Sequence, residues 1–242
     1  MTTERSNAFV ERMRQCTMLT EAELQVLRDL PVNIQNYEAH RDIVTEGDRP
    51  KQCFTVLDGV ASSYKLTGDG ARQITAFHIA GDMPDLHSLQ LHTIDTSICT
   101  ITPCNIGFVE HHVLHAVCAE SYSIAAALWR ITLIDGAIFR EWETNLGRRE
   151  AERAMAHLIC EQYARLEAVG RTEGTSFAFP VTQQELGDAL GLSTVHVNRT
   201  LQRLRMKAGL RFEGGKVDLF DWPTFAAEGD FDPAYLHLKA KH

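Results

Sequence analysis

Residues 181–210 read VTQQELGDALGLSTVHVNRTLQRLRMKAGL, and this stretch decides how the rest of the chain is interpreted. Thr182 and Glu185, three positions apart, form a capping box that begins one helix, and Gly191 supplies the turn that follows it. Ser193 is the N-cap of a second helix, which runs over about residues 194–208. Two short helices joined by so tight a turn predict a helix-turn-helix, whose second helix can enter a DNA major groove. The apolar residues that recur at helical spacing in the second helix are Val197, Leu201 and Leu204.

The outward side of this second helix has the chemistry of a groove-binding surface. Arginine can bond a guanine edge through two hydrogen bonds, asparagine can do the same with adenine, and short hydroxyls reach bases or phosphates. The alternative is a small helical subdomain with an ordinary solvated face. The residues that we expect to contact DNA are Thr194, His196, Asn198, Arg199, Gln202 and Arg203, with Thr182, Gln183 and Ser193 at the helix starts.

Composition and length are those of a soluble protein with room for two domains. The chain has 242 residues, of which 44% are hydrophobic and 23% charged. It has no run of about eighteen apolar residues, and its N-terminus is too polar for a signal peptide. The six cysteines are scattered, as is typical of reduced thiols. We expect a cytoplasmic protein with no membrane segment.

The net charge of −8 is unevenly distributed along the chain. Residues 181–216 hold six Lys and Arg against three Asp and Glu, a balance of +3, so the remaining residues carry −11. A locally basic segment on an acidic chain fits a DNA-docking domain attached to a domain that does not touch DNA.

Residues 33–110 change to short runs rich in β-branched and aromatic residues, separated by turns. Many short strands at nearly even spacing predict an antiparallel jelly-roll domain over residues 1–112, which begins with two helical pieces between Thr3 and Asp29. A hairpin wing is expected around Gly214-Gly215, and a short helix after Trp222. The predicted strand regions are NIQNY, DIVTEGD, CFTVLDGVASSYKL, ARQITAFHIAGD and ICTITPCNIGFVE.

Residues 113–146 read as a long helix with a hinge at Gly147, and residues 147–242 as the DNA-binding domain. An apolar seam runs along the helix, and a second apolar face includes Leu133, Ile134 and Phe139. One face can rest on the β domain, and the other favours the same helix of a second subunit. The alternative is a single buried helix. The seam residues, which we expect at a dimer interface, are Ile124, Leu128, Ile131, Ile138 and Trp142.

The order of these parts resembles the bacterial regulators related to the cyclic AMP receptor protein and the oxygen-responsive Fnr regulator. The resemblance is strongest in LTEAELQVLRDL, in GRREAERAMAHLICEQ and in residues 181–210. It implies an α+β fold with a cyclic-nucleotide-binding-like jelly roll, a long dimerisation helix and a winged helix-turn-helix. It also implies a transcription regulator that is a homodimer, binds a palindromic DNA operator and works with RNA polymerase. Arg199 matches an arginine that reads guanine in the family, and Thr194, Val195 and Asn198 match the other base-facing positions.

Two departures from the family pattern change these expectations. Val195 stands where relatives commonly carry a glutamate, so the operator half-site need not be theirs. The Gly-Glu and Arg-Ser or Arg-Thr pairs that hold a cyclic nucleotide are absent, and no Lys or Arg occurs between Arg72 and Arg130. A buried cyclic phosphate would then lack compensation for its desolvation, so cyclic AMP is not expected. Cys16 is the one N-terminal cysteine, so an iron-sulfur cluster is not expected either.

Other effector chemistry rests on isolated residues, and we expect neither a metal nor another cofactor. Asp85 and His87 are candidates to contact an effector. Cys99 and Cys104 on a predicted β-hairpin are either a redox pair or two core thiols. The histidines without a metal-ligand pattern are His87, His92, His111, His112 and His115.

Two other classes of protein compete with the regulator. A cupin-like metal-dependent enzyme would use the same jelly roll, but the β region lacks the His-X-His step of that class, and residues 181–210 would then have no role. An interaction module that has lost DNA binding would retard no promoter fragment. We expect no enzyme activity.

Overall fold

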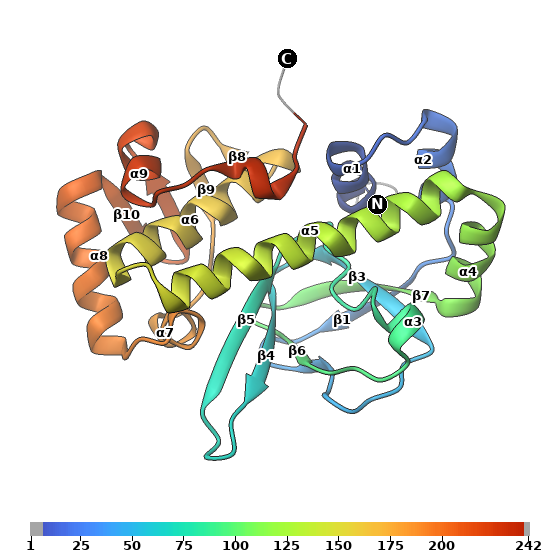
Figure 1. Ribbon diagram of the computed structural model, residues 1–242, viewed down its shortest axis with the longest axis horizontal. Coiled ribbons are helices and arrows are strands. Elements are labelled where there is room, and N and C mark those ends of the chain that lie inside the picture. Colours follow the sequence, from blue (N-terminus) through green and yellow to red (C-terminus); the bar gives the residue numbers. More distant parts are fainter. Residues whose placement is uncertain (1–6, 240–242) are drawn as a thin grey trace. The chain divides into compact units, whose positions relative to one another are not determined.

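The computed structural model describes residues 7–239, which form two compact units joined by a long helix (Figure 1). The first unit takes in the described residues of 1–64, 77–136 and 238–242, and the second takes in 65–76 and 137–237. The long helix, α5 (Tyr122–Gly147), therefore begins in the first unit and ends in the second.

The first unit is built around two antiparallel sheets, as the strand pattern predicts. One sheet has the order β1-β7-β3 and the other β2-β6-β4-β5, although residues 65–66 of β4 and 72–76 of β5 are grouped with the second unit. Apolar side chains from both sheets share one core, in which Phe54, Ile98 and Ile106 are fully buried. The strands are β1 (Asn33–Tyr37), β2 (Asp42–Val44), β3 (Gln52–Asp58), β4 (Ala61–Leu66), β5 (Arg72–His78), β6 (Ser97–Thr100) and β7 (Cys104–Glu110).

The predicted hairpin around Cys99 and Cys104 is wrong. β6 pairs with β2 and β4, whereas β7 pairs with β1 and β3, so the two cysteines lie in different sheets. Each thiol has its own polar neighbour: Cys99 Sγ lies 3.5 Å from Ser62 Oγ, and Cys104 Sγ lies 3.3 Å from the Val60 carbonyl oxygen. Both cysteines are free and buried.

Helices pack on this unit around a second apolar core. The capping box predicted at Thr20 is present, because Thr20 Oγ1 accepts the Glu23 N–H and Glu23 Oε2 accepts the Thr20 N–H. The helix predicted over 113–146 is instead two helices, since Ser121 adopts an extended conformation between them. Helices outside α5 in this unit are α1 (Asn7–Cys16), α2 (Glu21–Arg28), α3 (Ser88–Leu91) and α4 (His111–Glu120).

The seam of α5 faces the chain's own interior, so the predicted assignment of its two faces is wrong. Ile124, Leu128 and Ile131 belong to the second core of the first unit. Ile138 and Trp142 are each 4% exposed. The exposed apolar residues of α5 are Tyr122, Trp129, Leu133, Phe139 and Leu146, whereas Ile134 is buried. By length and composition alone α5 could cross a membrane, but its seam is packed inside the protein.

The second unit contains the helix-turn-helix and a four-stranded sheet of order β10-β11-β9-β8. The predicted wing is confirmed, since β10 and β11 pair around Gly214-Gly215, and the helix predicted after Trp222 is α9. The sequence interpretation missed the β8–β9 hairpin, which extends this sheet. The elements are α6 (Ala151–Ala168), β8 (Thr172–Glu173), β9 (Ser176–Ala178), α7 (Gln183–Leu190), α8 (Thr194–Ala208), β10 (Leu210–Glu213), β11 (Lys216–Leu219), α9 (Trp222–Glu228) and a 3-10 helix, η1 (Pro233–Leu236).

Candidate DNA-binding surface

The capping box at Thr182 fixes the start of α7. Thr182 Oγ1 accepts the Glu185 N–H at 3.1 Å, and Glu185 Oε2 accepts the Thr182 N–H at 2.7 Å. Because Glu185 is 3% exposed, this carboxylate serves the helix end and is not available to DNA. Gln183, the next residue, is exposed at the first turn.

The turn into α8 depends on two glycines. Gly191 has φ +64°, a left-handed conformation that favours glycine. A Cβ on Gly187 would lie 2.5 Å from the Leu192 carbonyl oxygen, so the turn can fold back against α7 this closely only with glycine there. Ser193 then caps α8 by accepting the His196 N–H at 3.3 Å.

The division of α8 into inner and outer faces agrees with the prediction. Val197 and Leu204 are 0% exposed, and Thr200 is also buried. Leu201 is half-buried. The expected DNA-contacting residues of α8 are all exposed, namely Thr194, Val195, His196, Asn198, Arg199, Gln202 and Arg203.

Three amides on the outer face are joined in a row that links the two helices. Gln202 Nε2 donates to Asn198 Oδ1 at 3.0 Å, and Asn198 Nδ2 donates to Gln183 Oε1 at 3.5 Å. Each amide keeps further donors and acceptors for a base edge. The row therefore places Gln183 of α7 on the same surface as the recognition positions of α8, where it was expected, through hydrogen bonds that sequence spacing alone did not indicate.

Most cations of this segment are paired within the chain. Arg203 Nη1 lies 2.8 Å from Glu152 Oε1 on α6, and Lys207 Nζ lies 2.6 Å from Glu228 Oε1 on α9. Arg205, Arg211 and Lys216 pair with Glu213, Asp218 and Glu173. Among the six Lys and Arg of residues 181–216, Arg199 alone has no hydrogen-bond or ion-pair partner within the described part of the chain. The basic balance of +3 inferred from the sequence is therefore offset in space by acidic residues from other segments.

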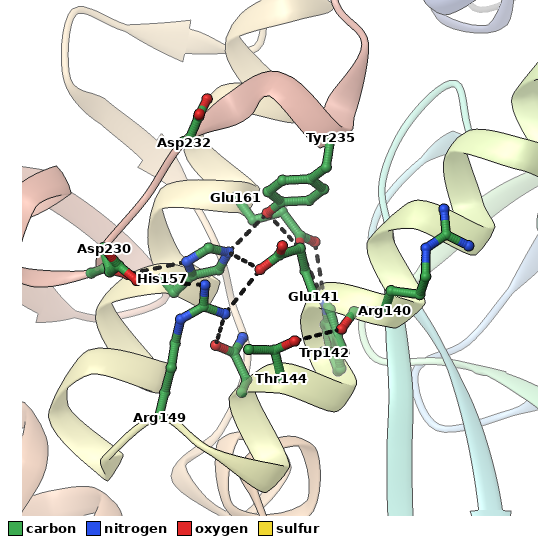
Figure 2. A network of polar contacts seen from close by, with 12 residues as sticks. Arg140, Glu141, Trp142, Thr144, Arg149, His157, Glu161, Asp230, Asp232 and Tyr235 are labelled. Carbon is green, nitrogen blue, oxygen red and sulfur yellow. Dashed lines mark hydrogen bonds and ion pairs between the residues drawn. The ribbon is translucent and has the colours of Figure 1, made fainter.

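A buried polar network ties the end of α5 to α6 and to the C-terminal segment (Figure 2). Glu161 on α6 is fully buried, and its carboxylate accepts hydrogen bonds from Trp142 Nε1 at 3.1 Å, Tyr235 Oη at 3.1 Å and Arg165 Nη1 at 3.2 Å. His157 lies between the Gly229 carbonyl oxygen, 3.1 Å from Nδ1, and the Tyr235 hydroxyl, 3.2 Å from Nε2.

The hinge predicted at Gly147 coincides with the end of α5, and the link to α6 is braced. Arg149 Nη1 donates to Glu141 Oε2 at 2.9 Å and to Asn145 Oδ1 at 3.0 Å, so the link is fastened back onto the last turns of α5. Burial raises the pKa of Glu161. Burial, and after it the Arg149 guanidinium, lowers the pKa of His157. Low solvent access is the largest cause of both shifts.

Asp85 and His87, the candidates for effector contact, lie in different surroundings. Asp85 is 0% exposed, and Oδ1 accepts the Phe54 N–H at 2.9 Å. Burial raises the pKa of Asp85 to about 8. His87 Nε2 lies 3.7 Å from Asp95 Oδ1 near the surface. Within residues 7–239, no group of three or more His, Cys, Asp or Glu side chains is placed to hold a metal ion.

Comparison with known protein families agrees with this architecture. Residues 34–121 match the family described as cyclic nucleotide-binding domain, and residues 153–227 match the Crp-like helix-turn-helix domain. The nitrogen fixation regulation protein FixK of Bradyrhizobium diazoefficiens is 25% identical over 223 residues, which cover 89% of this chain and 90% of that protein. The fumarate and nitrate reduction regulatory protein of Vibrio cholerae is 22% identical over 210 residues, which cover 84% of this chain and 81% of that protein.

A solved structure shows the same arrangement of elements. FixK2 from Bradyrhizobium japonicum superimposes with a TM-score of 0.74 and 26% sequence identity, over 82% of this chain and 97% of that one. The strands of the jelly roll fall in the first matched family region and the helix-turn-helix with its wing in the second. The chain belongs to the Crp/Fnr family of DNA-binding transcription regulators.

Proposed function

We propose that this regulator binds a palindromic operator as a homodimer and reads each half-site with the outer face of α8. The observation that carries the proposal is Arg199, an exposed guanidinium with no partner within the described residues, beside the amide row of Gln183, Asn198 and Gln202. A free guanidinium is ready to form two hydrogen bonds with a guanine edge, and the amides can read adenine. Val195, 68% exposed, offers an apolar contact such as a thymine methyl.

The second subunit would pack on the exposed apolar face of α5. Trp129 and Leu133 are four residues apart on this helix and are 66% and 56% exposed. Contiguous exposed apolar surface on a soluble protein marks an interaction site, and two copies of one helix can cover each other by two-fold symmetry. A two-fold dimer would present two recognition helices to half-sites about one DNA turn apart.

The remaining assignments follow from this role. A regulator of this kind works in the cytoplasm, with RNA polymerase as its further partner and without an enzymatic step. We expect an effector other than a cyclic nucleotide, because residues 73–129 contain no Lys or Arg to pair with the phosphate. We expect no resident metal or iron-sulfur cluster.

Selection of bound duplexes from a random DNA pool tests the proposal. We expect an enriched palindrome with two half-sites separated by one helical turn, containing a guanine at a fixed position in each half. Enrichment of a single, non-repeated half-site would contradict the dimer. A pool that shows no enrichment would contradict sequence-specific binding.

A further inference from the structure

The β domain has a cavity, open to solvent, where strands of its two sheets meet. Its volume is about 410 Å³, within the range of small-molecule sites. Tyr37 and Phe108 come from the three-stranded sheet and Ile43 and Val44 from β2 of the other, while residues 48–52 close it between β2 and β3. The lining residues are Phe108 and others that lie between Tyr37 and Gln52, so the cavity includes neither Asp85 nor His87.

The inner side of the cavity is apolar and firmly packed. Phe108 is 5% exposed and Val44 is 8% exposed, and both belong to the core between the sheets. The Tyr37 ring lies 6.3 Å from the Phe108 ring, centroid to centroid, and Ile43 packs against the same core. Because Tyr37 and Ile43 are half-buried while Phe108 and Val44 are nearly covered, a ligand that enters here meets mainly the Tyr37 ring and the Ile43 side chain.

The polar groups around this apolar floor have no partners of their own. The guanidinium of Arg49, the ammonium of Lys51 and the side-chain amide of Gln52 form no hydrogen bond or ion pair within residues 7–239, and the same holds for the Tyr37 hydroxyl. Asp48, the acidic residue among them, is engaged, since Oδ2 accepts the Thr45 N–H at 2.8 Å. The cavity thus has two free cations and two neutral donors around an aromatic floor.

We propose that this cavity binds a small organic carboxylate with an aromatic body. The ring would lie on Tyr37 and Phe108, and the carboxylate would accept hydrogen bonds from Arg49 and Lys51. Charge-assisted bonds of this kind are the stronger class in proteins. A neutral ligand would leave both cations unpaired. A phosphate ester without a ring would leave the apolar residues of the cavity exposed to water.

Binding is measured on the full-length protein without DNA, so the result does not depend on the DNA-binding function. The ligands are benzoate, phenylacetate and indole-3-acetate, each beside its primary amide, followed by saturation-transfer NMR and titration calorimetry. We expect at least one acid to bind saturably and its amide to bind about tenfold or more weakly, which corresponds to the loss of a charged hydrogen bond.

Two variants separate the cavity from the rest of the surface. Arg49→Gln with Lys51→Gln should weaken the acid about tenfold or more, and Tyr37→Phe should weaken it less because the ring stays. Arg41→Gln is the matched control, since Arg41 is an exposed cation of the same unit outside the cavity, and should bind as wild type does. Absence of saturable binding by all three acids, equal binding of acid and amide, or wild-type affinity in the double variant would each overturn the proposal.

Discussion

Arg199 differs from the other cations of its segment because nothing in the described chain competes for its guanidinium. DNA would therefore gain its hydrogen bonds without first breaking an ion pair. We expect Arg199→Ala to weaken binding to the selected operator by roughly 1–3 kcal/mol and to relax base choice at one position per half-site. Binding isotherms on the operator and on single-base variants measure both effects.

Arg205→Ala is the control for this substitution. Arg205 is also exposed on α8, but its Nη2 lies 3.0 Å from Glu213 Oε1. Its loss should leave base choice unchanged. If the two alanine variants lost affinity and selectivity alike, Arg199 would have no special role in reading the operator.

Asp85 makes the stability of the protein depend on pH. Its pKa in the folded protein is about 8, far above the ordinary 3.8, so between these values the folded state keeps a proton that the unfolded chain has lost. The free energy of unfolding therefore falls as pH rises through this range, by at most about 1.4 kcal/mol per pH unit. Asp85→Asn keeps an oxygen that can accept the Phe54 N–H and cannot ionise.

We expect the stability advantage of Asp85→Asn over wild type to grow from pH 5 to pH 8. Urea denaturation at three pH values measures it. Above pH 8 the difference should level off, because both states of the wild type are then ionised. A difference that is the same at every pH would mean that Asp85 is ionised in the folded protein.

For single residues, the sequence predicted which side chains are exposed but not which side chains they pair with. Helical spacing separates Val197 and Leu204 from Asn198 and Arg199 because one face must be buried. The pairing of Arg203 with Glu152 joins residues 51 positions apart, and no local pattern encodes it. Arg203 was expected at the DNA, and it must now exchange a carboxylate for a phosphate to reach it.

At the scale of the element, α5 shows that an apolar helix face can be predicted from sequence while the surface that it packs against is predicted wrongly. Its spacing indicates two apolar faces, and nothing in the spacing says which one meets the chain's own core. The face with Ile124 and Ile131 packs inside, since α1, α2 and α4 contribute apolar residues to the same cluster. The break at Ser121 was equally hidden, because serine also occurs within helices.

Leu133→Glu tests the other face of α5. The charge would be buried without a partner in a dimer but solvated in a monomer, so we expect the variant to dissociate at concentrations where wild type is dimeric. Sedimentation velocity and light scattering measure the mass. Val26→Glu is the control, because Val26 is an exposed apolar residue on α2 and 44% accessible. Should both variants keep the wild-type mass, this face would not be the dimer contact.

The network around Glu161 gives the C-terminal segment a structural role. Tyr235→Phe removes the hydroxyl that donates to Glu161 and lies 3.2 Å from His157 Nε2, and it leaves the ring stacked on His157. Removing one hydrogen-bond donor from a buried carboxylate lowers the free energy of unfolding by about 1–3 kcal/mol, so the second unit, which contains the helix-turn-helix, should unfold at a lower temperature. Calorimetry measures this change. Tyr163→Phe is the comparison, since its hydroxyl bonds the partly exposed Glu167 and should matter less.

At the scale of the whole molecule, the distribution of charge limits the affinity of the protein for DNA of non-specific sequence. Residues 137–237 contain twelve Lys and Arg against fifteen Asp and Glu. Each phosphate that a cation neutralises adds about −0.9 to the slope of log affinity against log salt. Because five of the six cations of residues 181–216 are already paired, we expect weak non-specific binding and a shallow slope.

Glu152→Gln should make non-specific binding tighter and more sensitive to salt. Glu152 pairs with Arg203 at 2.8 Å and lies 4.0 Å from Lys207, so the substitution releases Arg203 and loosens Lys207. Each released cation that reaches a phosphate should steepen the slope by about 0.9. Glu143→Gln changes the net charge equally, but Glu143 has no ion pair within the described residues, so its slope should stay at the wild-type value. If both variants gave the same slope of log affinity against log salt on a random duplex, total charge, and not the release of Arg203, would govern non-specific binding to DNA.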